Sequence, residues 1–348
     1  MSKKKLSKKD FDSLVDVIIS KTKVYGAVAD ANKTDCFDFK ELKSASGLRL
    51  DYDVTLQAPR KFFLPPVEEL LTFGEEGSYK SSYECEPFVL LGVHPYDMIA
   101  INQMDELFSQ DNYDSHYFAR RNNATIVALD VITPSENVFA SSMKTATVDN
   151  GYDVLLTDIG DCYIIDAATE KGEELVKLAE NASEATGSDL EKRQKVQDDN
   201  KKRLNKHELK CDPSYLPKLL EKAYDHPVWE ETAKTCFGCG SCNQVCPTCY
   251  CFNVKDDVNW DLANGKRERS WDGCLLNGFT KVAPDHEFRS SQADRFRHRL
   301  YRKAKYVPNK IGGQIACVGC GRCVSACLPD IANPVKIYNR LVEDLGIE

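Results

Sequence analysis

The pattern of apolar and polar residues predicts a mixture of helices and strands in the first half of the chain. Apolar residues recur at helical spacing between residues 11 and 25, whereas the runs 87–93 and 124–129 are short, apolar and rich in β-branched side chains. The first pattern predicts a helix that opens the chain, and the two runs predict strands. A further helix is predicted at 96–108, and a strand pair at 152–157 and 162–165.

The order of these elements predicts the domain organisation. Strands that alternate with helices are typical of an α/β layer, so residues 1–168 are predicted to form an N-terminal α/β-type domain. Charged residues dominate the next segment, 169–230, and its apolar positions keep a loose helical spacing, which predicts a solvated helical connector. Residues 231–348 form a third part that is rich in cysteine. The predicted fold class is therefore α+β.

Length, charge and hydropathy exclude several classes of protein. The chain has 348 residues, 42% of them hydrophobic, which suffices for two or three domains with real cores. Its net charge of −8 gives no overall basis for nucleic-acid binding. No run approaches 18 apolar residues, so no membrane span is expected. The basic N-terminus lacks an apolar segment behind it, and fifteen cysteines without a secretory signal predict a cytoplasmic location.

Two cysteine runs carry the candidate chemistry. Both follow the spacing C-x2-C-x2-C-x3-C, the first from Cys236 and the second from Cys317. In two-cluster ferredoxins, three cysteines of such a run bind one [4Fe–4S] cluster and the fourth binds the other cluster. The spacing therefore predicts two [4Fe–4S] clusters and one-electron transfer. Cluster 1 is assigned to Cys236, Cys239, Cys242 and Cys327, and cluster 2 to Cys317, Cys320, Cys323 and Cys246.

Zinc and disulfide bonds are the competing interpretations of these cysteines. A zinc site usually uses two C-x2-C pairs and needs neither the third nor the fourth cysteine of each run. Disulfide frameworks are typical of small secreted chains, unlike this one. Glycines inside both runs favour clusters, because they permit tight turns that aim N–H groups at sulfur. These glycines are Gly238, Gly240, Gly319 and Gly321.

Seven cysteines lie outside the two sets of ligands. Most of them are expected to be ordinary buried thiols. For Cys249 and Cys251, which closely follow Cys246, packing against the clusters and a role as additional ligands both stay open, and the role of Cys274 is also undecided. The remaining four are Cys36, Cys85, Cys162 and Cys211.

The two cysteine runs are separated by about 70 residues, which is more than in an ordinary two-cluster ferredoxin. Residues 252–312 are therefore predicted to be an insertion into a ferredoxin-like domain. The part of it from 289 to 310 holds eight Lys and Arg against one Asp, and it is predicted to form a basic amphipathic helix. One interpretation is functional: the run is a docking face for an acidic subunit, or its positive charge raises the cluster potential and steers an anionic carrier. The other interpretation, that the charges pair with the acidic remainder and solvate one face, also stays open.

Several sequence motifs resemble a known family. In the cluster half these are C-P-T-C-Y-C-F at 246–252, W-D-G-C at 271–274, R-F-R-H-R at 295–299 and C-V-G-C-G-R-C at 317–323. Weaker matches in the first half are P-R-K-F-F-L-P-P at 59–66 and G-V-H-P-Y-D at 92–97. With these motifs the chain resembles the iron–sulfur (beta) subunits of cytoplasmic [NiFe] hydrogenase/sulfhydrogenase complexes and the related A-type subunit of anaerobic sulfite reductase.

This resemblance implies an electron-transfer subunit of a soluble hetero-oligomer, with no active site of its own. Such a subunit carries electrons between a flavoprotein subunit that oxidises NAD(P)H and the catalytic subunit of a hydrogenase or reductase. No G-x-G-x-x-G motif follows a predicted strand, so the chain is not expected to bind NAD(P) or FAD alone, and no catalytic residue is assigned.

Alternatives to a hydrogenase-like subunit stay open. A relay linked to sulfite reductase or to heterodisulfide reductase would use the same clusters. An enzyme whose N-terminal domain binds a small substrate or flavin, and a redox-sensing binding protein, belong to different classes. Co-purification discriminates between them, because a relay travels with a flavoprotein, an enzyme turns over alone, and a sensor changes partners on oxidation.

Overall fold

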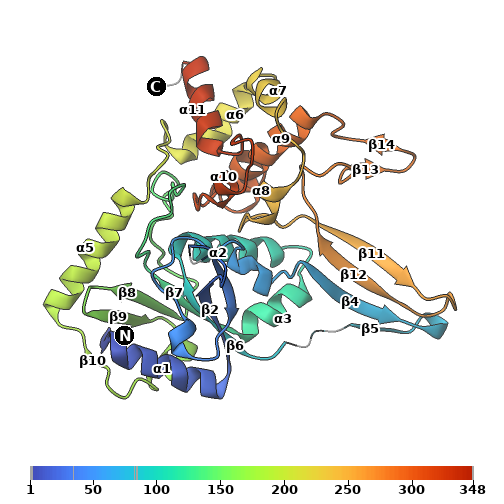
Figure 1. The fold of residues 1–348 in the computed structure, drawn as a ribbon. Coiled ribbons are helices and arrows are strands. Elements are labelled where there is room, and N and C mark those ends of the chain that lie inside the picture. Colours follow the sequence, from blue (N-terminus) through green and yellow to red (C-terminus); the bar gives the residue numbers. More distant parts are fainter. Residues whose placement is uncertain (1–2, 34, 82, 84, 347–348) are drawn as a thin grey trace.

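A large mixed sheet forms the base of the molecule, and the helices that surround the cysteine runs lie above it (Figure 1). The computed structural model describes residues 3–33, 35–81, 83 and 85–346. The sheet has eight strands in the order β10-β1-β9-β8-β7-β6-β2-β3. The strands are β1 (Lys4–Ser7), β2 (Lys23–Ala29), β3 (Phe37–Glu41), β6 (Phe88–Val93), β7 (Ala124–Leu129), β8 (Val154–Asp158), β9 (Cys162–Ala167) and β10 (Ser183–Glu184).

Helices cover both faces of the four parallel strands at the centre of this sheet, β2, β6, β7 and β8. Alternate residues of β6 enter opposite cores: Leu90 packs with α2 and α3, whereas Val89 packs with α1. A parallel sheet that is buried on both faces produces continuous apolar runs, which confirms the strands predicted at 87–93 and 124–129. The helices are α1 (Lys8–Lys21), α2 (Pro95–Phe108) and α3 (Ser115–Asn123).

The opening helix is shorter than predicted. The hydroxyl oxygen of Ser7 accepts a hydrogen bond from the backbone N–H of Asp10 and caps the start of α1. The helix ends before Thr22, whose backbone is extended, and β2 begins at Lys23. The prediction was therefore wrong for residues 23–25, because the buried Val24 pairs with Val89 of β6 instead of continuing the helix.

Residues 169–230 do not form a free connector in the described part of the chain. Strand β10 extends the large sheet by pairing with β1, and α4 packs beside β9. Further on, Leu219 and Trp229 are buried in the core of the cluster half. The many charged residues of this segment made its few buried apolar residues hard to recognise in the sequence. The domain boundaries at 168 and 230 stay predictions. The helices are α4 (Glu170–Val176), α5 (Gly187–Arg203), α6 (Leu216–Lys222) and α7 (Val228–Ala233).

The cluster half is built from short helices around one apolar core. Phe296, Tyr301 and Tyr338 are almost completely buried in it, together with Trp229. The helices are α8 (Ser241–Gln244), α9 (Gln292–Tyr301) with a π-helical continuation at Arg302–Tyr306, α10 (Arg322–Ser325) and α11 (Pro334–Asp344). A small hairpin joins β13 (Lys281–Val282) to β14 (His286–Glu287). Single 3-10 turns lie at Ala45–Gly47, Pro59–Phe62, Glu75–Gly77, Pro213–Tyr215 and Pro308–Lys310.

A second sheet projects from the molecule as an arm (Figure 1). It consists of β11 (Phe252–Val258), β12 (Gly265–Trp271), β4 (Val67–Phe73) and β5 (Tyr79–Ser81), in that order. The hairpin of β11 and β12 comes from the predicted insertion, and β12 pairs with β4 from the first half of the chain. The buried Arg269 of β12 is ion-paired with Glu68 of β4 and with Asp114. The two halves of the chain therefore share one sheet.

Among the described residues, no helix is both long enough and apolar enough to cross a membrane.

Candidate iron–sulfur sites

The two cysteine runs fold into loops with the same backbone conformation. In the first loop Gly238 and Gly240 have φ angles of 65° and 73°, and in the second loop Gly319 and Gly321 have φ angles of 65° and 80°. These left-handed conformations are readily accessible only to glycine. Each loop then enters a one-turn helix directly after its second glycine, α8 in the first case and α10 in the second. The sequence repeat is therefore also a structural repeat.

Each of two small cavities is lined by four cysteines drawn from both runs. The first cavity combines the first three cysteines of run one with the last cysteine of run two. The second cavity combines the first three cysteines of run two with the last cysteine of run one. This grouping supports the crossed assignment made from the spacing. The first cavity holds Cys236, Cys239, Cys242 and Cys327, and the second holds Cys246, Cys317, Cys320 and Cys323.

The two cavities differ in their surroundings. Apart from its cysteines and Ser241, the first cavity has apolar walls, which include Phe237 and Phe296. Cys239 in its wall is the one exposed cysteine of the eight. The second cavity lies deeper, and the charged side chains of Arg299 and Lys303 line it. The same loop geometry therefore gives one site close to solvent and one site beside two buried cations.

Hydrogen bonds also reach the cysteine sulfurs. The amide Nε2 of Gln292 donates to Cys236 Sγ at 3.3 Å. The Cys239 sulfur lies 3.3 Å from Ser241 Oγ, and the hydrogen bond from this hydroxyl lowers the pKa of the Cys239 thiol. Donors of this kind stabilise thiolates and tune the potential of a bound cluster.

The N-terminal half holds the second loop through a buried ion pair. The guanidinium of Arg322, inside the second run, forms two hydrogen bonds with Asp97 of α2, at 2.6 and 2.7 Å. Its Nε donates to the backbone oxygen of Thr55 at 2.8 Å. Asp97 is thus the salt-bridge partner of Arg322.

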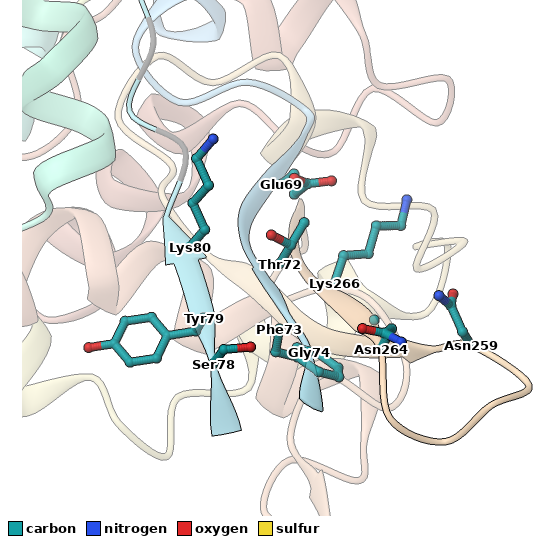
Figure 2. Close-up of a pocket in the computed structure, with 11 residues that line it drawn as sticks. Glu69, Thr72, Phe73, Gly74, Ser78, Tyr79, Lys80, Asn259, Asn264 and Lys266 are labelled. Carbon is teal, nitrogen blue, oxygen red and sulfur yellow. The ribbon is translucent and has the colours of Figure 1, made fainter. Parts of the chain in front are cut away.

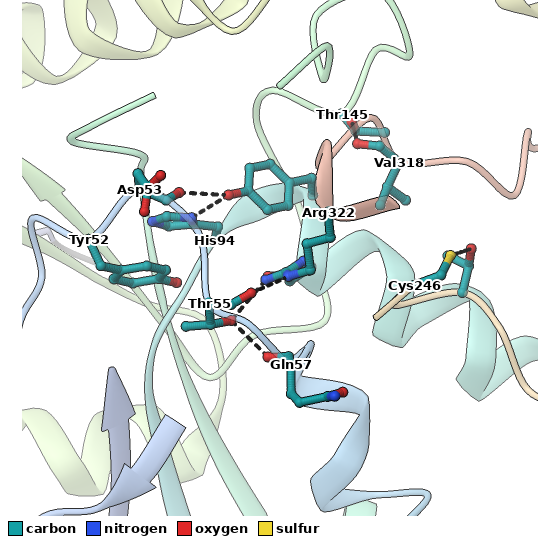
Figure 3. Close-up of polar contacts among 12 residues, drawn as sticks. Tyr52, Asp53, Thr55, Gln57, His94, Thr145, Cys246, Val318 and Arg322 are labelled. Atoms are coloured by element: carbon teal, nitrogen blue, oxygen red, sulfur yellow. Dashed lines mark hydrogen bonds and ion pairs between the residues drawn. The ribbon is translucent and has the colours of Figure 1, made fainter. Parts of the chain in front are cut away.

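Backbone contacts complete the attachment of the second loop. The N–H of Phe139 donates to the carbonyl of Gly319 at 2.7 Å, and the Thr145 hydroxyl donates to the carbonyl of Val318 at 2.7 Å (Figure 3). A Cβ atom on Gly321 would lie only 2.3 Å from the backbone oxygen of Asn137. Glycine is therefore required here for close packing as well as for its φ angle.

A buried histidine lies beside this attachment. The ring of His94 stacks on that of Tyr52 with 4.1 Å between centroids, and its Nδ1 lies 2.6 Å from the hydroxyl of Tyr96 (Figure 3). Burial places the pKa of His94 well below its usual value, so the ring is neutral at physiological pH. The histidine thus packs between two buried tyrosines, Tyr52 and Tyr96.

The predicted pairing of the basic run with acidic residues is present in part, because Arg295 pairs with Glu287, Arg297 with Asp294 and Lys305 with Glu221. The run also supplies Arg299 and Lys303 to the walls of the cysteine cavities. It forms α9 and its π-helical continuation, as predicted, but Arg295, Arg299 and Lys303 recur at intervals of four residues and are all buried. Arg299 is 4% exposed and Lys303 is 8% exposed. Neither an exposed docking face nor a solvated face fits these side chains.

The charges of Arg299 and Lys303 fit anionic groups at the cavities. Neither side chain has a carboxylate partner among the described residues, and Nε of Arg299 is buried without a hydrogen-bond partner there. Burial lowers the pKa of Arg299, but the nearby thiols of Cys242 and Cys323, when ionised, raise it by more. Buried cations are costly without an anion. Thiolate-bound iron–sulfur clusters provide that anion, so the residues present fit the group.

Burial also explains why two of the cysteines need a metal to ionise. It raises the pKa values of Cys242 and Cys317 to about 12. A coordinated metal ion deprotonates a thiol outright.

Among the described residues, no three Cys, His, Asp or Glu side chains converge closely enough to hold one metal ion.

A larger, open pocket lies away from the cysteines, on the arm (Figure 2). Its volume is about 550 Å³, and side chains of both charges line it, including Glu69, Lys80 and Lys266. It contains no cysteine and is separate from the candidate sites.

Sequence reasoning raised an effect of the basic run on cluster potential, but it did not single out the cations that lie at the sites. Arg299 and Lys303 were seen only as part of a charged run, although their four-residue spacing was a signal of one shared helix face. Arg322 stood inside the second motif, and its partner Asp97 is 225 residues away. No local pattern reveals such a pairing.

The fold and the paired cysteine loops define an iron–sulfur protein. Residues 235–331 match the family model described as a 4Fe-4S dicluster domain. The chain is 33% identical over 325 residues to the sulfhydrogenase 2 subunit beta of Pyrococcus furiosus, and the alignment covers 93% of each chain. The chain therefore belongs to the sulfhydrogenase beta-subunit family, which confirms the resemblance, and it is a hydrogenase-related iron–sulfur electron-transfer protein. No solved structure matches it significantly.

Proposed function

We propose that the chain relays single electrons through two [4Fe–4S] clusters between two other subunits of a cytoplasmic complex. One partner is a flavoprotein that oxidises NAD(P)H, and the other is the catalytic subunit of a hydrogenase or reductase, most readily a sulfhydrogenase. The observation that carries the proposal is the pair of cavities, each lined by four cysteines from both runs. Fifteen cysteines, none in a disulfide bond among those described, support a reducing compartment.

The ligands in this proposal follow the crossed pattern. Cys236, Cys239, Cys242 and Cys327 hold cluster 1, and Cys317, Cys320, Cys323 and Cys246 hold cluster 2. A [4Fe–4S] cluster, when bound, accepts and releases one electron at a time. The residues of the chain orient the clusters and set their potentials through burial, through N–H and O–H groups near sulfur, and through the charges of Arg299 and Lys303.

Exposure at the first cavity indicates where electrons cross the surface. Cys239 is exposed, and two apolar side chains beside the cavity, Phe237 and Leu328, are 71% and 90% exposed. A partner that covers this rim would bring its own redox centre close to cluster 1. The second cavity lies under Phe139 and communicates with the surface less directly.

Reconstitution tests this proposal. The chain would be purified anaerobically, alone and together with a candidate flavoprotein subunit. Alone it should not oxidise NADH or NADPH, whereas with the flavoprotein and either nucleotide the visible absorbance of its clusters should bleach. Reduction of the clusters without any flavoprotein would identify an enzyme instead. A redox sensor would be identified if the clusters stay oxidised with every candidate flavoprotein and if oxidation of the clusters changes which protein binds to the chain.

The terminal partner is tested separately. A complex that evolves hydrogen with NADPH or NADH supports the hydrogenase assignment. A complex that lacks hydrogenase activity but reduces sulfite or a heterodisulfide would assign the relay to one of the other two complexes.

A further inference from the structure

A third cavity in the cluster half is lined by three cysteines outside the two ferredoxin sets. Cys249, Cys251 and Cys274 share its wall with Asn243 and Tyr250. Its volume is about 20 Å³, the same as the first and second cavities. Three of the seven remaining cysteines, one of them more than 20 residues away from the others, therefore meet around a space like the two candidate cluster sites.

The base of the arm brings these three cysteines together. Cys251 directly precedes β11, and Cys274 follows the end of β12 by three residues. Phe252 pairs with Trp271 at the base of this hairpin, and the N–H of Asp272 donates to the carbonyl of Cys251 at 3.0 Å. The hairpin register thus fixes the chain segment of Cys251 beside that of Cys274.

Arg60 from the N-terminal half anchors both segments. Its guanidinium lies 3.8 Å from the centroid of the Trp271 ring, and Nη2 donates to the carbonyl of Gln244 at 2.9 Å. Nη1 donates to the carbonyl of Cys249. Arg60 is 2% exposed, so these bonds form a buried and rigid support for the loop that carries Cys249.

Polar side chains around the third cavity point at its sulfurs. The amide Nδ2 of Asn243 lies 3.5 Å from Cys274 Sγ and 3.7 Å from Cys249 Sγ, and Asn243 is 2% exposed. Arg299 and Lys303 line the third cavity as well as the second, so the two cavities adjoin. An amide donor and two buried cations without carboxylate partners among the described residues are a surrounding suited to thiolates.

We propose that Cys249, Cys251 and Cys274 are the protein ligands of a third iron–sulfur cluster, a [4Fe–4S] cube with three cysteine thiolates. The described walls of the cavity contain no fourth Cys, His, Asp or Glu, so the fourth iron takes a small ligand that these walls do not supply. This cluster would adjoin cluster 2 and extend the series of one-electron centres. Its existence does not depend on the identity of the partner subunits.

Iron content tests the proposal directly. Wild-type protein, isolated anaerobically within its complex and then as the single chain, should contain about twelve iron and twelve sulfide ions per chain instead of about eight. Cys274→Ser and, separately, Cys251→Ser should reduce this to about eight while the signals of the two ferredoxin clusters persist. Cys211→Ser is the matched control, because Cys211 packs against the same core but lines none of the three cavities.

A spectroscopic measurement on the wild type avoids any folding defect of the variants. A cube with only three thiolates loses its fourth iron on mild oxidation, so ferricyanide should release about one iron per chain and produce the EPR signal of a three-iron cluster. Cys274→Ser should not show this signal. About eight irons in the wild type, or one zinc per chain that disappears in Cys274→Ser, would overturn the proposal, and both results would leave the electron-relay function standing.

Discussion

Replacing Asp97 by Asn should destabilise the attachment of the second cysteine loop more than any surface substitution. Asp97 is fully buried and Arg322 is 3% exposed, so the ion pair between them has almost no solvent screening. In Asp97→Asn, an NH₂ group replaces one carboxylate oxygen and faces a guanidinium nitrogen, which leaves a buried cation uncompensated. Removing one partner of a buried pair costs about 3–5 kcal/mol. The unfolding equilibrium constant should therefore rise by about 150-fold to 5,000-fold.

Anaerobic urea unfolding measures this loss. Tryptophan fluorescence would follow the protein, and visible absorbance and EPR would follow the clusters. Arg340→Gln is the matched control, because its pair with Asp344 is largely exposed and should contribute little to stability. Cluster 2 should be lost before cluster 1 in Asp97→Asn, since Arg322 belongs to the second loop.

A double variant separates the charge from the packing. Asp97→Asn combined with Arg322→Met has no buried unpaired charge, although the carbonyl of Thr55 loses its donor. An unsatisfied buried acceptor costs about 1–3 kcal/mol, so the double variant should be more stable than Asp97→Asn alone. The reasoning fails if Asp97→Asn behaves like the surface control, or if the double variant is less stable than the single one.

Three further outcomes are expected. Cys246→Ser should perturb the cluster held by Cys317, Cys320 and Cys323, whereas Cys327→Ser should perturb the cluster held by Cys236, Cys239 and Cys242. EPR of each variant checks this, and damage confined to the cluster of the variant's own run would refute the crossed assignment. Arg299→Gln should lower the reduction potentials of the clusters because it removes a buried positive charge. Arg297→Gln is the control and should leave the potentials unchanged, because the Arg297 guanidinium stacks 3.9 Å from the centroid of the Tyr224 ring; an EPR-monitored redox titration compares the two variants. The pKa of His94 is depressed in the folded protein, so the unfolded chain takes up a proton at this residue first as the pH falls below about 6.5. Below pH 6.5 the stability of the wild type should therefore drop by up to about 1.4 kcal/mol per pH unit. His94→Gln should lack this pH-dependent loss of stability. If its urea midpoint differs from that of the wild type by the same amount at pH 7.5 and at pH 5.5, the role assigned to His94 is wrong.

The sequence was informative where local pattern and final environment agree. Helix α2 and strands β6 and β7 carry apolar residues at positions that the fold buries, so their periodicity predicted them. The cysteine spacing predicted which side chains line each cavity, because the loop geometry is local. The apolar pattern and the conformation of each loop are contained within a few consecutive residues, but each cavity also takes one cysteine from the other run.

The remaining features depend on contacts between distant segments. Strand β12 has the sequence Gly-Lys-Arg-Glu-Arg-Ser-Trp, which looks solvated, yet Arg269 is buried because Glu68 and Asp114 neutralise it. Arg299 and Lys303 likewise occupy interior positions that the hydrophobic pattern assigns to apolar residues. The third cavity needs the hairpin to bring Cys274 back to Cys251, and neither residue reveals this from its own neighbourhood.

The unequal surroundings of the two repeated loops have a consequence for oxidative damage. The second loop is sealed by the backbone of residues 137–140 and by Arg322, whereas the first loop presents Cys239 and Phe237 to solvent. Dioxygen or peroxide arriving from outside meets the first loop before any other cysteine of the two runs. Inactivation in air should therefore begin at cluster 1, and a partner subunit seated over Phe237 and Leu328 would serve as its shield as well as its electron donor or acceptor.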